Sequence, residues 1–108
     1  MIIINNELLA YFRGRDLCEL CGRQLAPGEF AHPHHVHPRG HGGGSRLDVA
    51  LNLLSVCWQC HGDRAHDGKK ARQQGMEIIA YREGLAVEQV QQAIWTLLRR
   101  DKYARCRA

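Results

Sequence analysis

Two closely spaced cysteine pairs constrain the fold of this chain more than any other feature of its sequence. The pairs are Cys18-Glu-Leu-Cys21 and Cys57-Trp-Gln-Cys60. At this two-residue spacing, a tight turn directs both sulfur atoms of a pair at one tetrahedral ion. The 35 residues between the pairs are more than an ordinary compact zinc finger holds. We therefore expect a separate structure to be inserted between two zinc knuckles, the short turns that each cysteine pair forms. The sequence therefore predicts one structural zinc bound by Cys18, Cys21, Cys57 and Cys60.

The alternative is that the two pairs are unrelated reduced cysteines packed in the core, where free cysteines are common. Two matched spacings in one short chain favour the zinc. Cys106 has no partner at ligand spacing and is predicted to be a free thiol.

The size of the chain allows one small core. With 108 residues and a mass of 12.3 kDa, we predict a single domain over 1–108 that a metal would stabilise. A net charge of +4 and an isoelectric point near 9.0 favour polyanionic partners. The apolar start, Met1 to Ile4, is too short for a signal peptide core or a membrane span. We therefore expect a cytoplasmic protein without membrane contact, in which reduced cysteines bind metal rather than form disulfides.

Local patterns predict short elements around the cysteines. Leu8, Leu9 and Phe12 recur at helical spacing after an asparagine, which predicts an amphipathic helix over 6–13. Strands are expected within 29–37 and over 53–56, and the glycine-rich segment 38–45 is expected to be an exposed loop. A helix is expected over 58–71, and residues 76–81 fit either a helix or a strand. A C-terminal amphipathic helix is expected at about 85–100, closed by Arg99-Arg100.

All seven histidines fall within 32–66, between and beside the cysteines: His32, His34, His35, His37, His41, His61 and His66. Three pieces of this region resemble the HNH endonucleases over about 18–75: His34-His35-Val36, Asn52 before Leu-Leu-Ser-Val-Cys57, and Cys60-His61. The stretch from Pro38-Arg39-Gly40 to Gly44 is also similar to a loop of phage-borne members of that family.

The resemblance implies a small α+β fold, in which a ββα-metal finger is stabilised by the structural zinc and flanked by N- and C-terminal helices. It also implies a metal-dependent endonuclease that hydrolyses phosphodiester bonds in DNA with one divalent ion. In that family the position of His34 is a metal ligand, that of His35 is the general base, that of Asn52 braces the loop between the strands, and that of His61 completes the metal site.

Elementary chemistry agrees with these roles. Adjacent strand residues point to opposite faces, so His34 and His35 cannot both bind one ion without distortion. Neutral imidazole is well suited to take a proton from water near pH 7. The catalytic ion stays open among Mg²⁺, Mn²⁺, Ni²⁺ and Zn²⁺.

His66 follows His61 by five residues, about 140° around an ideal helix. Either a delayed helix start lets His66 reach the ion, or it contacts a DNA phosphate. His32, His37 and His41 are interpreted as solvated loop residues.

Other residues leave the function class open. Arg39, Lys69, Lys70, Arg72, Arg99 and Arg100 fit phosphate contacts and a solvated charged face equally well. Trp58 and Trp95 are interpreted as packing residues.

A noncatalytic zinc-stabilised nucleic-acid-binding module is the main alternative to the endonuclease, but it leaves the series His34, His35, Asn52 and His61 without a purpose. A zinc-stapled protein-interaction domain that uses the C-terminal helix explains still less.

Overall fold

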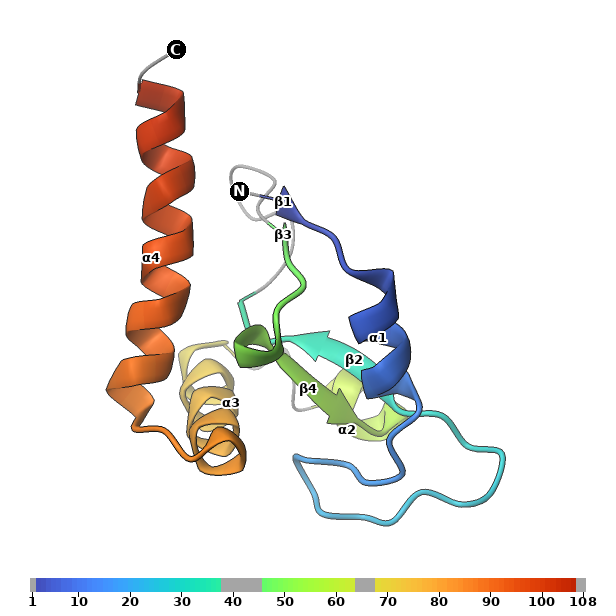
Figure 1. Ribbon diagram of the computed structural model, residues 1–108. Helices are drawn as coiled ribbons and strands as arrows, with labels where there is room; N and C mark the ends of the chain where they lie inside the picture. Colours follow the sequence, from blue (N-terminus) through green and yellow to red (C-terminus); the bar gives the residue numbers. More distant parts are fainter. Residues whose placement is uncertain (1, 38–45, 64–67, 107–108) are drawn as a thin grey trace.

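The structure of the protein is a computed structural model that describes residues 2–37, 46–63 and 68–106 (Figure 1). Its elements in chain order are β1 (Ile2–Ile3), α1 (Asn6–Arg13), β2 (His32–His35), β3 (Arg46–Leu47), the 3₁₀ turn η1 (Ala50–Asn52), β4 (Leu53–Val56), α2 (Trp58–Asp63), α3 (Gly68–Glu83) and α4 (Val87–Cys106).

The centre of the fold is an antiparallel pair of strands, β2 and β4, in which His34 lies opposite Leu54 and His35 opposite Leu53. Every residue of β4 is buried. Since α1 and α3 both pack against this strand, neither of its faces meets solvent. A second, smaller sheet pairs β1 with β3 in parallel.

The core lies between the sheet of β2 and β4 and the two last helices, α3 and α4. Leu54, Val56, Ile79 and Val90 belong to one buried cluster that also contains Cys18, Cys57 and Cys60. Helix α3 comes so close to the sheet at Gly75 that a Cβ there would lie 2.9 Å from Val36 Cγ2. Helix α4 lies beside α3 (Figure 1).

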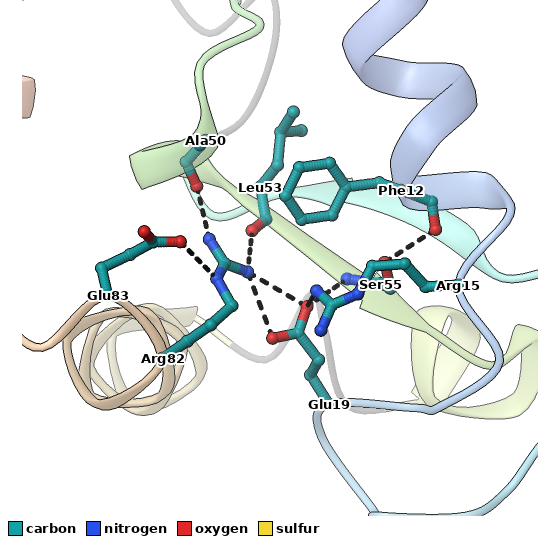
Figure 2. A network of polar contacts seen from close by, with 8 residues as sticks. All are labelled: Phe12, Arg15, Glu19, Ala50, Leu53, Ser55, Arg82 and Glu83. Atoms are coloured by element: carbon teal, nitrogen blue, oxygen red, sulfur yellow. Dashed lines mark hydrogen bonds and ion pairs between the residues drawn. The ribbon is translucent and has the colours of Figure 1, made fainter.

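A half-buried arginine, Arg82, connects α3 to the sheet and to the first cysteine turn. Arg82 donates from Nη2 to the carbonyl oxygen of Ala50 at 2.6 Å and from Nη1 to that of Leu53 at 2.9 Å (Figure 2). Nη1 also lies 3.1 Å from both carboxylate oxygens of Glu19, whose Oε1 accepts the backbone N–H of Ser55 at 2.8 Å. The ion pair between Arg82 and Glu19 therefore links α3 to β4 and to the turn that holds Cys18 and Cys21.

The structure confirms the predicted α+β class. The helix over 6–13 and the strand over 53–56 have the predicted bounds, and the side chain of Asn5 caps the helix by accepting the N–H of Leu8 at 3.0 Å. The strand expected within 29–37 is limited to His32–His35, and residues 76–81, which fitted helix or strand, are helical within α3. The loop expected at 38–45 lies outside the described residues.

Two helix predictions need correction. The single helix expected over 58–71 is wrong, because Gly68 has a φ of 72° and a right-handed helix cannot continue through that conformation. The structure has α2 and α3 as separate helices, with residues 64–67 outside its description. The basic pair at 99–100 does not end the last helix, which continues to Cys106, since the residues that follow the pair include no glycine or proline.

Candidate active site

The structure brings the four predicted zinc ligands together. The Sγ atoms of Cys18, Cys21, Cys57 and Cys60 all lie within 4.8 Å of one another. Four sulfurs at about 2.3 Å from one tetrahedral zinc would be about 3.8 Å apart, so this cluster fits the ion after a small contraction. In each pair the backbone N–H of the second cysteine points at the first sulfur, with N···S distances of 3.5 Å in both. These are the turns that the two-residue spacing predicted.

The electrostatics of the cluster also suit a cation. Burial raises the pKa of the Cys57 thiol, but hydrogen bonds from Cys60, Cys18 and the Arg23 guanidinium more than offset it and lower the pKa to about 6. Burial and the neighbouring sulfurs raise the pKa of Cys60. The Cys57 thiol therefore ionises readily while that of Cys60 resists, and zinc would supply the positive charge that four thiolates need.

A second cluster is made of imidazoles from two elements. His32 and His34 are two residues apart on β2 and share one face, which looks toward His61 on α2. The ring of His61 stacks on that of His32 at 5.6 Å between centroids and meets that of His34 edge-on at 5.7 Å. The second knuckle positions His61, because its backbone N–H donates to the carbonyl oxygen of Cys57 at 2.9 Å.

This cluster changes the interpretation of two histidines. His32 is exposed, as expected, but it lies in β2 rather than in a loop, with its ring on His61. His37 was expected to be solvated as well, but it is half-buried, and burial together with the Arg72 charge lowers its pKa. His41 and His66 lie outside the described residues.

Within residues 2–37, 46–63 and 68–106, only the four cysteines form a group of three or more ligand side chains close enough to hold an ion. The ring nitrogens of His32, His34 and His61 are farther apart than the four sulfur atoms. The ring centroids are 5.6 Å apart for His32 and His61 and 5.7 Å apart for His34 and His61.

His35 points to the other face of β2, where a buried carboxylate holds it. Its Nε2 lies 2.6 Å from Asp48 Oδ1, and the Asp48 side chain is fully buried. Arg46 donates to both Asp48 oxygens at 3.0 and 3.1 Å, and the Asn5 N–H donates to Oδ2 at 2.9 Å. Burial raises the pKa of Asp48, but these donors and the Arg46 charge outweigh it and lower the pKa to about 2. Asp48 is therefore ionised at neutral pH.

Asn52 holds the two ends of the segment between β2 and β3. Its Oδ1 accepts the His37 N–H at 2.7 Å, and its Nδ2 donates to the carbonyl oxygens of Leu47 at 3.0 Å and His37 at 3.4 Å. The side chain is buried, so these bonds are shielded from water.

Sequence reasoning missed Asp48 and misread both tryptophans. Asp48 is the only acid in the apolar stretch from Leu47 to Val56, and an acid in such a stretch signals a buried, paired carboxylate. Trp58 and Trp95 were predicted to pack, but they are 62% and 61% exposed.

Among the basic residues, Lys69 and Lys70 are exposed and Arg72 is half-buried, whereas Arg39 and the side chains of Arg99 and Arg100 lie outside the description.

The structure contains a small ββα-metal unit, made of the two strands β2 and β4 and the following helix α2, which carries the ligand-type residue His61. Two cysteine turns with one candidate zinc site stabilise it. The sequence model of the HNH endonuclease family matches residues 18–67. Residues 18–67 therefore carry an HNH endonuclease domain, a nuclease domain of the hydrolase class. The predicted resemblance is thereby confirmed.

No curated protein and no solved structure gave a match to the chain. Among the helices described, none combines the length and apolar character required to span a bilayer.

Proposed function

We propose that the chain is a metal-dependent endonuclease that hydrolyses phosphodiester bonds in DNA, with His35 as general base. The observation that carries this proposal is that His34 and His35 point to opposite faces of β2. His34 faces His61, while His35 is turned away and held by Asp48. This division supports His34 as a ligand of the ion and His35 as the acceptor of a proton.

His34 and His61 would hold the divalent ion. His32 offers a third imidazole through its contact with His61, and His66 stays a predicted ligand outside the described residues. Imidazole donors favour Zn²⁺, Ni²⁺ or Mn²⁺ over Mg²⁺. A bound ion would polarise the scissile phosphate and stabilise the leaving oxygen.

The hydrogen bond to Asp48 suits His35 to the role of base. When Nε2 carries the proton that is donated to Asp48 Oδ1, the other ring nitrogen, Nδ1, has a free lone pair in the neutral ring. Nδ1 takes a proton from the attacking water, whose oxygen then forms the new bond to phosphorus as the bond to the leaving oxygen breaks. The ionised Asp48 carboxylate stabilises the imidazolium that results.

Asn52 keeps this geometry in place without touching substrate. It fixes the backbone just beyond His35 through His37, and the backbone just before Asp48 through Leu47. We also propose that the whole chain acts as one domain, with α4 outside the matched segment but packed against α3.

Nicking of supercoiled plasmid tests the proposal. Purified protein should convert supercoiled DNA to open-circular or linear forms when Mn²⁺, Ni²⁺, Zn²⁺ or Mg²⁺ is added and should not do so without metal. A mock preparation from cells that lack the protein controls for contaminating nuclease. Folded, zinc-loaded protein that binds DNA but cuts with none of these ions would instead be the noncatalytic module.

A further inference from the structure

We propose that a pocket between the end of β2, α3 and α4 binds an unpaired nucleotide of the DNA, close to the site of cleavage. The position relative to cleavage rests on the proposed function, but the pocket itself does not. It has a volume of about 480 Å³, within the usual range for ligand sites of about 300–1,000 Å³. Its walls include an imidazole, a guanidinium, an indole and two amides.

A buried nitrogen of Arg72 marks the anionic end of the ligand. Arg72 lines the pocket, and its Nε is buried without a hydrogen-bond partner in the described part of the chain. Glu88 lines the same pocket, yet no ion pair joins the two among the described residues. Leaving a buried donor unsatisfied is costly, and a phosphate oxygen would satisfy it with a charge-assisted bond.

The α4 side of the pocket suits a nucleobase. Trp95 lines it while remaining 61% exposed, so an indole face is open for stacking. Met76 and Ile94 supply apolar surface, and the amides of Gln91 and Gln92 carry donors and acceptors for a base edge. The Glu88 carboxylate can accept from an exocyclic amine, which places the base near Glu88 and the phosphate near Arg72.

The concave shape requires an unpaired nucleotide, since a base inside a duplex is stacked and paired and must leave the helix to enter a pocket. The pocket also lies close to the proposed base. His37 lines it only two residues after His35, a span of at most about 7 Å along the backbone. At a rise of about 3.4 Å per nucleotide, this is about two nucleotides from the cleaved bond. Substrates with a single-stranded flank are therefore the class that this pocket selects.

Fluorescence anisotropy of labelled DNA tests the pocket directly. The full chain is titrated, without added divalent metal, into a blunt duplex and into the same duplex with a four-nucleotide single-stranded extension, and the DNA is checked afterwards for integrity. Stacking of one base is worth a factor of about 5- to 140-fold in affinity, so the extended duplex should bind tighter by an amount in this range.

Variants assign that preference to the pocket. Trp95→Ala and Arg72→Gln should each reduce the preference to less than threefold, and Trp95→Phe should retain most of it because a phenyl ring also stacks. Tyr81→Ala is the matched control, since Tyr81 is a 92% exposed aromatic residue of α3 that does not line the pocket, and it should keep the full preference. Thermal melting confirms that each variant is folded.

The outcomes separate this proposal from the proposed function. Equal affinity for the two duplexes, or a preference that survives Trp95→Ala in folded protein, would overturn the pocket even if plasmid cleavage is observed. A preference that depends on Trp95 and Arg72 would support it even if no plasmid is cut.

Discussion

A single buried carboxylate, that of Asp48, joins three segments that are distant in sequence. It accepts hydrogen bonds from Asn5 near the N-terminus, from Arg46 in β3 and from His35 in β2. A carboxylate buried with these donors is favoured in its ionised form. The residue that orients the proposed base therefore also fastens the N-terminal segment to the fold.

This arrangement predicts an acid-sensitive contribution to stability. The pKa of Asp48 falls from an ordinary 3.8 to about 2, so its ionised form contributes about 2 kcal/mol to folding. Because the folded-state pKa is the lower one, this contribution is complete above pH about 5 and is lost as pH falls toward 2. Denaturant unfolding of wild type and Asp48→Asn at a series of pH values measures it. As pH falls below about 5, and as far as the zinc-loaded protein stays folded, the wild type should lose stability faster than the variant, by up to about 2 kcal/mol, and parallel curves would contradict the pKa shift.

At the scale of elements, one arginine adds a polar link to the apolar packing between α3 and the rest of the fold. The guanidinium of Arg82 donates to the carbonyl oxygens of Ala50 and Leu53 and to the carboxylate of Glu19 (Figure 2). It also lies over the Phe12 ring, at 5.1 Å from the ring centroid. A lysine has one ammonium group and cannot make this set of contacts.

Arg82→Lys should therefore lower the free energy of unfolding by about 1–3 kcal/mol, since buried carbonyl groups lose their donors. Arg13→Lys is the matched control, because Arg13 is exposed and its side chain makes no hydrogen bond or ion pair among the described residues, and it should change stability by less than about 0.5 kcal/mol. Denaturant unfolding measures both. Equal effects of the two substitutions would show that the Arg82 network does not hold α3.

The approach of α3 to the sheet gives a second prediction for this scale. A Cβ at position 75 would lie 2.9 Å from Val36 Cγ2, and the β-branched Val36 side chain has little freedom to move. Gly75→Ala should therefore destabilise the protein by about 1–2 kcal/mol, because overpacking outweighs the gain in helix propensity. Gly62→Ala in α2 should instead stabilise it by about 0.5–1 kcal/mol, since a Cβ there meets nothing within 4 Å. Thermal or denaturant unfolding that moved both variants in the same direction would contradict this.

The elements that could be predicted from the sequence are those with local signals. The helix over 6–13 has a capping asparagine and an apolar face, and the strand over 53–56 is an apolar segment with a single serine. The cysteine cluster was predictable as well, because its spacing is a property of adjacent residues.

What the sequence did not predict depends on contacts between distant residues. The boundary between α2 and α3 follows from the backbone conformation of Gly68, and the place of His32 follows from the strand that carries it to His61. Asp48 and Arg82 each bind groups that are tens of residues away, which no local pattern reveals. The roles of His34, His35, Asn52 and His61 stay predictions that only biochemistry can test.

At the scale of the whole molecule, one ion is expected to determine whether the chain folds. Three of the four cluster cysteines are buried in the core itself. Zinc binding in such sites is worth about 10–16 kcal/mol, which is comparable to the entire stability of a small domain.

Elemental analysis of reduced protein should accordingly find one tightly bound zinc per chain, and its removal by a chelator should unfold the protein. Cys21→Ser should lower zinc content and melting temperature together, because a hydroxyl cannot replace a thiolate ligand. Cys106→Ser, at the cysteine predicted to be a free thiol, should leave both unchanged. Zinc-free protein that remains folded, or a Cys21→Ser variant that melts like wild type, would refute this role.

The cleavage rate of His35→Ala, compared with wild type at saturating divalent metal, tests the central claim most directly. The variant should cut plasmid about 10²- to 10⁴-fold more slowly, because only the group that takes the proton from water is removed. Its zinc content and its affinity for DNA should equal those of wild type, and a mock preparation should show no nicking. Wild-type cleavage by pure, folded His35→Ala would show that His35 is not the base.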